Sequence, residues 1–144
     1  CRRQAQDAES RLDPNAPIAQ VLRLAAEKIV AFLQSDFGQR IYRMAVAESE
    51  NFPALAHEFY HSGPRLVQDR IAEFLHHAVD RGELAIDDID LAAAQFAQLC
   101  KATLHDRLIF ATTPCCTAKD TDRVIDGAVQ MFMARYGAPS QGRR

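Results

Sequence analysis

Helix-breaking residues are scarce in this sequence. Its 144 residues include only 6 glycines and 6 prolines, and most of these stand where a helix would end. Segments in which apolar and polar residues alternate, as they do in strands, are also missing. With 48 % apolar and 25 % charged residues, the composition is that of an ordinary globular protein. A single all-α domain over residues 1–144 is therefore expected, and the chain is long enough to form a sizeable core.

An excess of positive charge is absent as well. The 17 basic and 19 acidic residues leave a net charge of −2, which gives the chain no electrostatic reason to bind nucleic acid by itself. The longest uncharged runs, such as residues 91–100, fall far short of the ~20 residues that a membrane helix needs. We therefore expect no membrane partner.

Cysteine pairs with regular spacing are also lacking. Cys1, Cys100, Cys115 and Cys116 form no Cys-x-x-Cys motif, and this pattern is typical of a reducing cytosol rather than of a disulfide framework. A cytoplasmic location is therefore expected. Cys115 and Cys116 stand in an expected loop, so a thiol-reactive role for them is a hypothesis that the sequence leaves open. Because the chain opens with Cys rather than Met, in the middle of a helical pattern, we expect it to be a fragment.

Apolar residues recur at helical spacing through most of the chain. Pro53 is suited to a first helical turn, whereas Gly63-Pro64 predicts a kink or break. Ser35, Asp88 and either Thr117 or Thr121 are expected N-caps. About six helices in an antiparallel bundle are expected, over residues 17–34, 35–52, 53–81 with its interruption, 89–110 and 117–136.

One string has the form of a zinc protease signature. His57-Glu58-x-x-His61 places two histidines on one helical face, with Glu58 in the position of a general base. A zincin also needs a third protein ligand and an edge strand, and the sequence offers neither. We expect no metal, no cofactor and no enzyme activity, and a small helical metalloenzyme remains the alternative hypothesis. The adjacent His76 and His77 point about 100° apart on a helix and cannot act as a pair.

Several short motifs follow one another in a characteristic order. They are Arg43-Met44-Ala45-Val46-Ala47-Glu48, Phe52-Pro53-Ala54-Leu55-Ala56, Phe59-Tyr60, Gly63-Pro64, Arg81-Gly82-Glu83-Leu84, Asp90-Leu91-Ala92-Ala93-Ala94-Gln95-Phe96 and Phe132-Met133-Ala134-Arg135-Tyr136-Gly137. Their order and spacing resemble the C-terminal regulatory domain of TetR-family transcriptional repressors, most closely the AefR-like subgroup. The resemblance covers most of the chain.

The resemblance implies a small apolar or aromatic effector bound among the central helices. Residues 53–81 contain a break that leaves room beside it. The expected ligand-binding residues are Phe32, Ile41, Met44, Glu48, His57, Phe59, Tyr60, His61, Leu75 and Phe96. For each of them, filling the core is an equally good interpretation.

The resemblance also implies a homodimer, which the pattern of the last two long helices supports. Both are apolar on more than one face, so each needs a second partner. The expected interface residues are Leu91, Ala93, Ala97, Leu104, Val124, Ala128, Met131 and Phe132, with Phe96 shared between core and interface. A helix-turn-helix head would lie upstream and is absent from the chain as given. Operator DNA is therefore expected to be a partner only through a missing N-terminal domain. A plain helical interaction module is the remaining alternative, and the sequence names neither the effector nor the operator.

Overall fold

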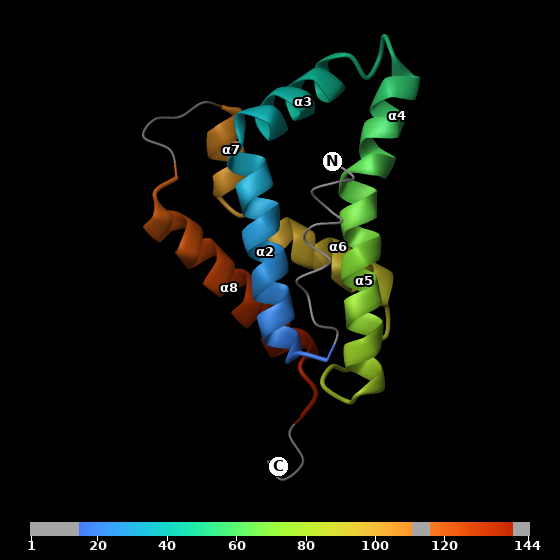
Figure 1. The fold of residues 1–144 in the computed structure, drawn as a ribbon, viewed down its shortest axis with the longest axis vertical. Coiled ribbons are helices and arrows are strands. Elements are labelled where there is room, and N and C mark those ends of the chain that lie inside the picture. The colour runs from blue at the N-terminus through green and yellow to red at the C-terminus, as the bar shows by residue number, and fades with distance from the viewer. Residues whose placement is uncertain (1–14, 111–115, 140–144) are drawn as a thin grey trace.

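The computed structural model describes residues 15–110 and 116–139. Within these ranges the chain forms seven helices (Figure 1). They are α2 (Ile18–Gln34), α3 (Asp36–Ala47), α4 (Pro53–Ser62), α5 (Pro64–Asp80), α6 (Ile89–Leu99), α7 (Leu104–Ile109) and α8 (Ala118–Tyr136). The expected all-α fold is confirmed, and the only β-pairing among the described residues is an isolated bridge between Leu84 and Gly137.

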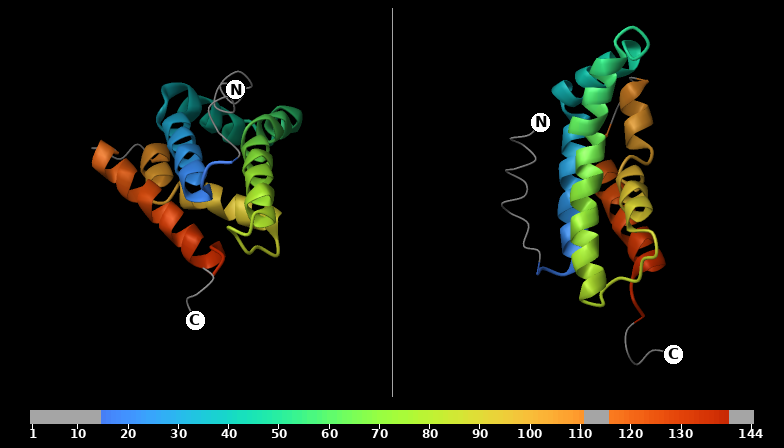
Figure 2. Two further views of the ribbon diagram at one scale, coloured as in Figure 1. Left: turned by 60° about the horizontal axis from the view of Figure 1, so that its bottom comes forward. Right: turned by 90° about the vertical axis from the view of Figure 1, so that its right-hand side faces the viewer.

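Two long helices form the frame of the domain. α2 and α5 run in opposite directions, α6 crosses behind them, and α8 packs along α2 and α6 (Figures 1 and 2). α3 leads from the end of α2 to α4 at one end of the molecule, and α4 then continues into α5. We call residues 36–62, which comprise α3, the connecting turn and α4, the α3–α4 arm. No helix of the described chain is both long and apolar enough to cross a lipid bilayer.

Local sequence signals set most of the helix ends. The Ser35 hydroxyl accepts a hydrogen bond from the Gly38 N–H at 3.0 Å, and the Asp88 carboxylate accepts one from the Leu91 N–H at 3.0 Å. Thr117 and Asp120 form a reciprocal capping box at the start of α8. Gly82 has a φ of +78°, the left-handed conformation that ends α5 most easily without a side chain. These caps, and the breaks before Pro53 and Pro64, confirm the sequence predictions.

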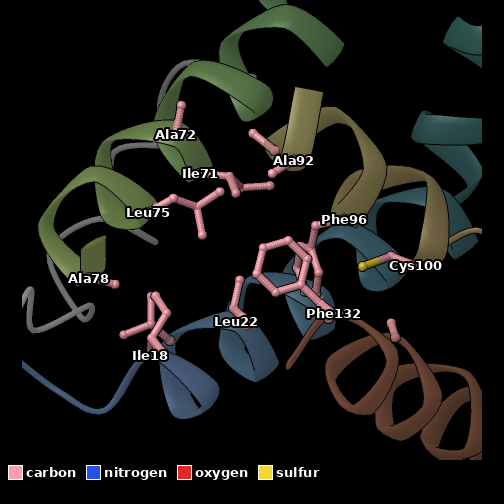
Figure 3. Close-up of a cluster of buried hydrophobic side chains, with 14 of the residues drawn as sticks. Ile18, Leu22, Ile71, Ala72, Leu75, Ala78, Ala92, Phe96, Cys100 and Phe132 are labelled. Atoms are coloured by element: carbon pink, nitrogen blue, oxygen red, sulfur yellow. The ribbon is translucent and has the colours of Figure 1, made fainter. Parts of the chain in front are cut away.

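The hydrophobic core joins α2, α5, α6 and α8. Phe96 of α6 and Phe132 of α8 meet edge to face at its centre, with ring centroids 5.4 Å apart (Figure 3). Both rings are almost completely buried, as are Leu22 of α2 and Leu75 of α5. Tyr136 donates a hydrogen bond to the Gln95 side chain and so ties the end of α8 to α6. This four-helix unit therefore carries most of the burial that stabilises the described chain.

The prediction of one helix over residues 89–110 was wrong. α6 ends at Leu99, α7 begins at Leu104, and Thr103 between them has a φ of +61°. No glycine or proline marks this break, so the apolar spacing predicted that the helix continues. Tertiary packing overrides that local preference. The change of direction buries Leu104 and brings His105 against α3. It also makes seven described helices where about six were expected.

The predicted helix end near Phe52 was also wrong, because α3 stops at Ala47. The polar run of residues 48–51 forms a turn instead, closed by a 2.7 Å hydrogen bond from the Phe52 N–H to the Glu48 carbonyl. Cys100 is a free, buried thiol. Cys116 is disulfide-bonded, which the sequence interpretation did not expect, and Cys1 and Cys115 lie outside the described residues.

Candidate functional site

The α3–α4 arm exposes most of the large apolar side chains that the described chain leaves in contact with solvent. Nine such side chains are exposed, and six of them belong to the arm: Phe37, Met44, Val46, Phe52, Leu55 and Tyr60. α3 buries only Gly38 and Ala45, and α4 buries no residue at all. Exposed apolar groups that are concentrated on one part of a surface indicate a binding site.

Three aromatic rings connect the arm to α7. Tyr42 of α3 meets His105 of α7 edge to face, with ring centroids 4.7 Å apart. Tyr42 also meets Phe59 of α4 at 6.4 Å in the same kind of arrangement. All three side chains are partly buried. We call Tyr42, Phe59 and His105 the Tyr42 cluster, and it is the point where α3, α4 and α7 converge.

Lys101, in the turn before α7, and His105, in its first turn, add polar groups to this cluster. The His105 N–H donates a 3.1 Å hydrogen bond to the Lys101 carbonyl, so the two residues lie one turn apart. Desolvation lowers the pKa of the Lys101 ammonium. Desolvation also lowers the pKa of His105, and the nearby Lys101 charge acts in the same direction, whereas Asp106 opposes it. His105 is therefore a neutral imidazole at pH 7, able to donate one hydrogen bond and accept another.

A backbone contact fixes α7 against α3. The Arg43 guanidinium donates a 2.8 Å hydrogen bond to the Leu108 carbonyl near the end of α7. On the other side of α7, Arg107 lies 3.7 Å from the Asp120 carboxylate of α8. α7 thus links the aromatic cluster to the helix that was expected to form the dimer interface.

The ten predicted ligand-binding residues fall into two groups. Leu75 and Phe96 are completely buried in the four-helix core and have a packing role in this conformation. Seven of the other eight lie in the arm. Phe32 lies beside it, with its ring centroid 6.3 Å from that of Phe37. Those eight are Phe32, Ile41, Met44, Glu48, His57, Phe59, Tyr60 and His61. No ligand contact is tested by their placement, so the assignment stays a prediction.

The eight predicted interface residues also divide. Ala93, Ala97, Leu104, Ala128 and Phe132 are buried within the protomer, and Val124 is partly buried against the core. Leu91 of α6 and Met131 of α8 remain exposed, at 52 % and 62 %. These two side chains are the ones still free to contact a second protomer, and the interface itself stays a prediction.

The two histidines of the zincin-like string do lie together. Their Nε2 atoms are 3.0 Å apart on the exposed surface of α4. Across the part of the chain that the structure describes, however, no group of three or more histidine, cysteine or acidic side chains is placed to share an ion. The third ligand that a catalytic zinc site needs is therefore missing from the described residues.

A shallow hollow on the described surface lies along α8. It is lined by Lys119, Asp122, Arg123, Asp126, Gly127 and Gln130. Its rim is charged and it opens widely to solvent, so it does not suit an apolar ligand.

Sequence reasoning missed Tyr42 and Lys101, and it left His105 as an isolated histidine. One signal was available, since Lys101 and His105 stand four residues apart and would share a face of the predicted helix over residues 89–110. The contact of His105 with Tyr42 joins residues 63 positions apart and depends on the unpredicted break before α7.

Comparisons with known proteins agree on the class of this domain. Residues 20–138 match the family described as AefR-like transcriptional repressor, C-terminal domain. The solved structure of the flavonoid-responsive regulator FrrA is similar, with a TM-score of 0.80 and 25 % identity over 94 % of this chain and 70 % of that one. A TetR-family regulator from Mesorhizobium loti MAFF303099 has the same fold, with a TM-score of 0.73 and 18 % identity over 94 % of this chain and 64 % of that one. Among curated protein sequences there is no match.

Proposed function

Because the chain belongs to the AefR-like transcriptional repressors, whose C-terminal domain it contains, we propose that the α3–α4 arm binds a small aromatic effector. The domain is the ligand-binding and dimerisation part of a transcriptional regulator, with the fold of the TetR family. The family is one of regulators rather than enzymes, and we propose no catalytic activity and a cytoplasmic location for this chain. DNA binding belongs to a helix-turn-helix domain that the 144 residues do not include.

The observation that carries the effector proposal is the Tyr42 cluster. Ligand sites combine apolar and aromatic walls with a few polar groups that orient the ligand. Tyr42 and Phe59 supply aromatic surfaces, and His105 supplies ring nitrogens. The loosely packed arm can move to admit a ligand at low cost, because it buries so few residues. Similarity to a flavonoid-responsive regulator supports an aromatic ligand rather than an aliphatic one.

Dimerisation through α6 and α8 is the second part of the proposal. Leu91 and Met131 are exposed on helices whose other faces lie in the core. Gly127, one turn before Met131, has open space where a side chain would stand, so nothing in the protomer requires a glycine there. A glycine in a helix interior costs about 1 kcal/mol relative to alanine. Close approach of a partner helix would offset that cost.

The link between the two sites is α7. It contacts α3 through Tyr42 and Arg43 and reaches α8 through the ion pair of Arg107 with Asp120. A ligand that moves α3 against α7 would therefore shift α8, and α8 would change the spacing of two DNA-binding domains in the full-length dimer. This coupling requires the ligand to bind the two arrangements with different affinities.

A thermal-shift screen of the 144-residue chain with small aromatic compounds tests the effector site. A ligand at a hundredfold excess over its Kd stabilises the folded chain by about 2.7 kcal/mol. We expect Tyr42→Ala to abolish the shift, while Phe110→Ala, which removes a 77 % exposed ring outside the cluster, preserves it. An equal shift in both variants would place the ligand elsewhere.

Analytical ultracentrifugation tests the dimer. We expect a dimer at low micromolar concentration, since obligate interfaces often bury more than ~2,000 Å². Leu91→Glu combined with Met131→Glu should give a monomer, and Val46→Glu on the arm should not. A wild-type monomer at that concentration would refute this part of the proposal.

A further inference from the structure

Lys101 differs from the other partly buried cationic side chains of the described chain. Arg23, Arg65, Arg70 and Arg107 are also partly buried, and each lies within 4 Å of a carboxylate. The Lys101 ammonium, in contrast, has no hydrogen-bond or ion-pair partner within the described residues. The cationic residues in the described ranges that also lack a carboxylate partner, such as Lys28 and Arg40, are exposed to solvent.

An ammonium that loses part of its hydration without gaining a negative partner destabilises the fold. Here desolvation does lower the pKa of Lys101, and the charge of Lys101 in turn lowers the pKa of the neighbouring His105. Among the described residues, the carboxylate that raises the pKa of His105 is Asp106, which is exposed. Lys101 is therefore a partly desolvated cation without a carboxylate partner among the described residues.

Lys101 adjoins the Tyr42 cluster through His105. His105 contacts Tyr42 at 4.7 Å, and its N–H donates a hydrogen bond to the Lys101 carbonyl across the break at Thr103. A flat ring lying against Tyr42 and Phe59 would thus lie beside the His105 imidazole, close to Lys101. An ionised oxygen on such a ring could then pair with the Lys101 ammonium and accept a hydrogen bond from His105.

We propose that the effector is an aromatic acid, whose ring packs against Tyr42 and Phe59 and whose ionised carboxylate or phenolate oxygen pairs with Lys101. The inference rests on the proposed effector site and adds the chemical class of its ligand. A charge-assisted hydrogen bond of this kind contributes about 1.5–3 kcal/mol, which corresponds to roughly a 10- to 100-fold change in Kd. His105 orients the oxygen, and Lys101 discriminates an anion from a neutral compound of the same shape.

The test compares two ligands that differ only in charge. Cinnamate and cinnamamide have the same ring and the same length, and only the first is an anion at pH 7. Isothermal titration of the 144-residue chain should give a Kd for cinnamate at least tenfold lower than for cinnamamide. Lys101→Met should weaken cinnamate binding by roughly 10- to 100-fold and change cinnamamide binding by less than threefold. Lys28→Met, on exposed α2 surface, is the matched control and should change neither.

The possible results distinguish the aromatic-acid proposal from the proposed effector site on which it rests. Equal affinities for the two ligands, or equal losses of both in Lys101→Met with an unchanged circular dichroism spectrum, overturn the aromatic-acid assignment and leave an aromatic effector site standing. Flavone, a flavonoid with no ionisable group, is the third probe. Binding of flavone without cinnamate also overturns the acid assignment. Failure of all three to bind removes the proposed site together with the inference.

Discussion

Phe96 provides the clearest distinction between a packed core and a pocket wall. The ring is completely buried and lies edge to face on Phe132 at 5.4 Å. A buried phenylalanine removes roughly 150–250 Å² from water, which at about 25 cal/mol per Å² gives about 4–6 kcal/mol. Truncation to alanine loses most of this stabilisation, so Phe96→Ala should lower the free energy of unfolding by about 4 kcal/mol. For a domain of this size the melting temperature should fall by roughly 10 °C or more.

Urea denaturation followed by circular dichroism measures this change. Phe110→Ala is the control, since that ring is 77 % exposed and its loss should change the free energy of unfolding by less than about 0.5 kcal/mol. Should Phe96→Ala prove too unstable to purify, Phe96→Leu keeps most of the volume and should cost about 1 kcal/mol. A loss of less than about 1 kcal/mol in Phe96→Ala would mean that the ring lines empty space, and the packing argument would be refuted.

Three further predictions concern other parts of the fold. Gly127→Ala should raise the unfolding free energy of the protomer by about 0.5–1 kcal/mol while weakening the dimer in sedimentation, because its Cβ meets open space within the protomer. Burial raises the pKa of the Cys100 thiol to about 12, so peptide mapping should find Cys100 unmodified by iodoacetamide at pH 8 in the native chain and modified in urea. Hydrogen bonds from Thr117 hold the pKa of Asp120 below its ordinary value. The stability that this carboxylate adds is therefore present above pH ~4 and is lost as the pH falls through its folded pKa. Asp120→Asn should remove that part of the pH dependence of the unfolding free energy, and an unchanged wild-type slope in the variant would contradict the assignment.

Local chemistry determined the parts of the fold that the sequence predicted well. Ser35, Asp88 and Thr117 each cap the helix that follows, because a side-chain oxygen three residues before an unpaired N–H is a short-range signal. Pro53 and Pro64 start helices for an equally local reason. The order and spacing of the short motifs also indicated the family, and the family match over residues 20–138 confirms it.

The parts that were missed depend on contacts between distant residues. The break at Thr103 has no glycine or proline to mark it, and it exists because Leu104 packs into the core while His105 meets α3. Helical spacing cannot show which of two apolar faces is the inner one. For that reason Leu75 and Phe96 were expected near a ligand, whereas the structure buries them in the four-helix core. Tyr42 was overlooked because its importance comes from neighbours on two other helices.

The unequal burial of the two halves has a consequence for how such a domain can evolve. Most of the buried residues belong to α2, α5, α6 and α8, whereas α4 contributes no buried residue and α3 only Gly38 and Ala45. Surface substitutions away from packed sites usually change stability by less than about 0.5 kcal/mol, so residues of the arm can be exchanged without unfolding the chain. Selection for a new inducer can therefore act on the arm while the core keeps the domain above its stability threshold. A lineage of regulators built on this plan can change what it senses one residue at a time, with no compensating mutation in the scaffold.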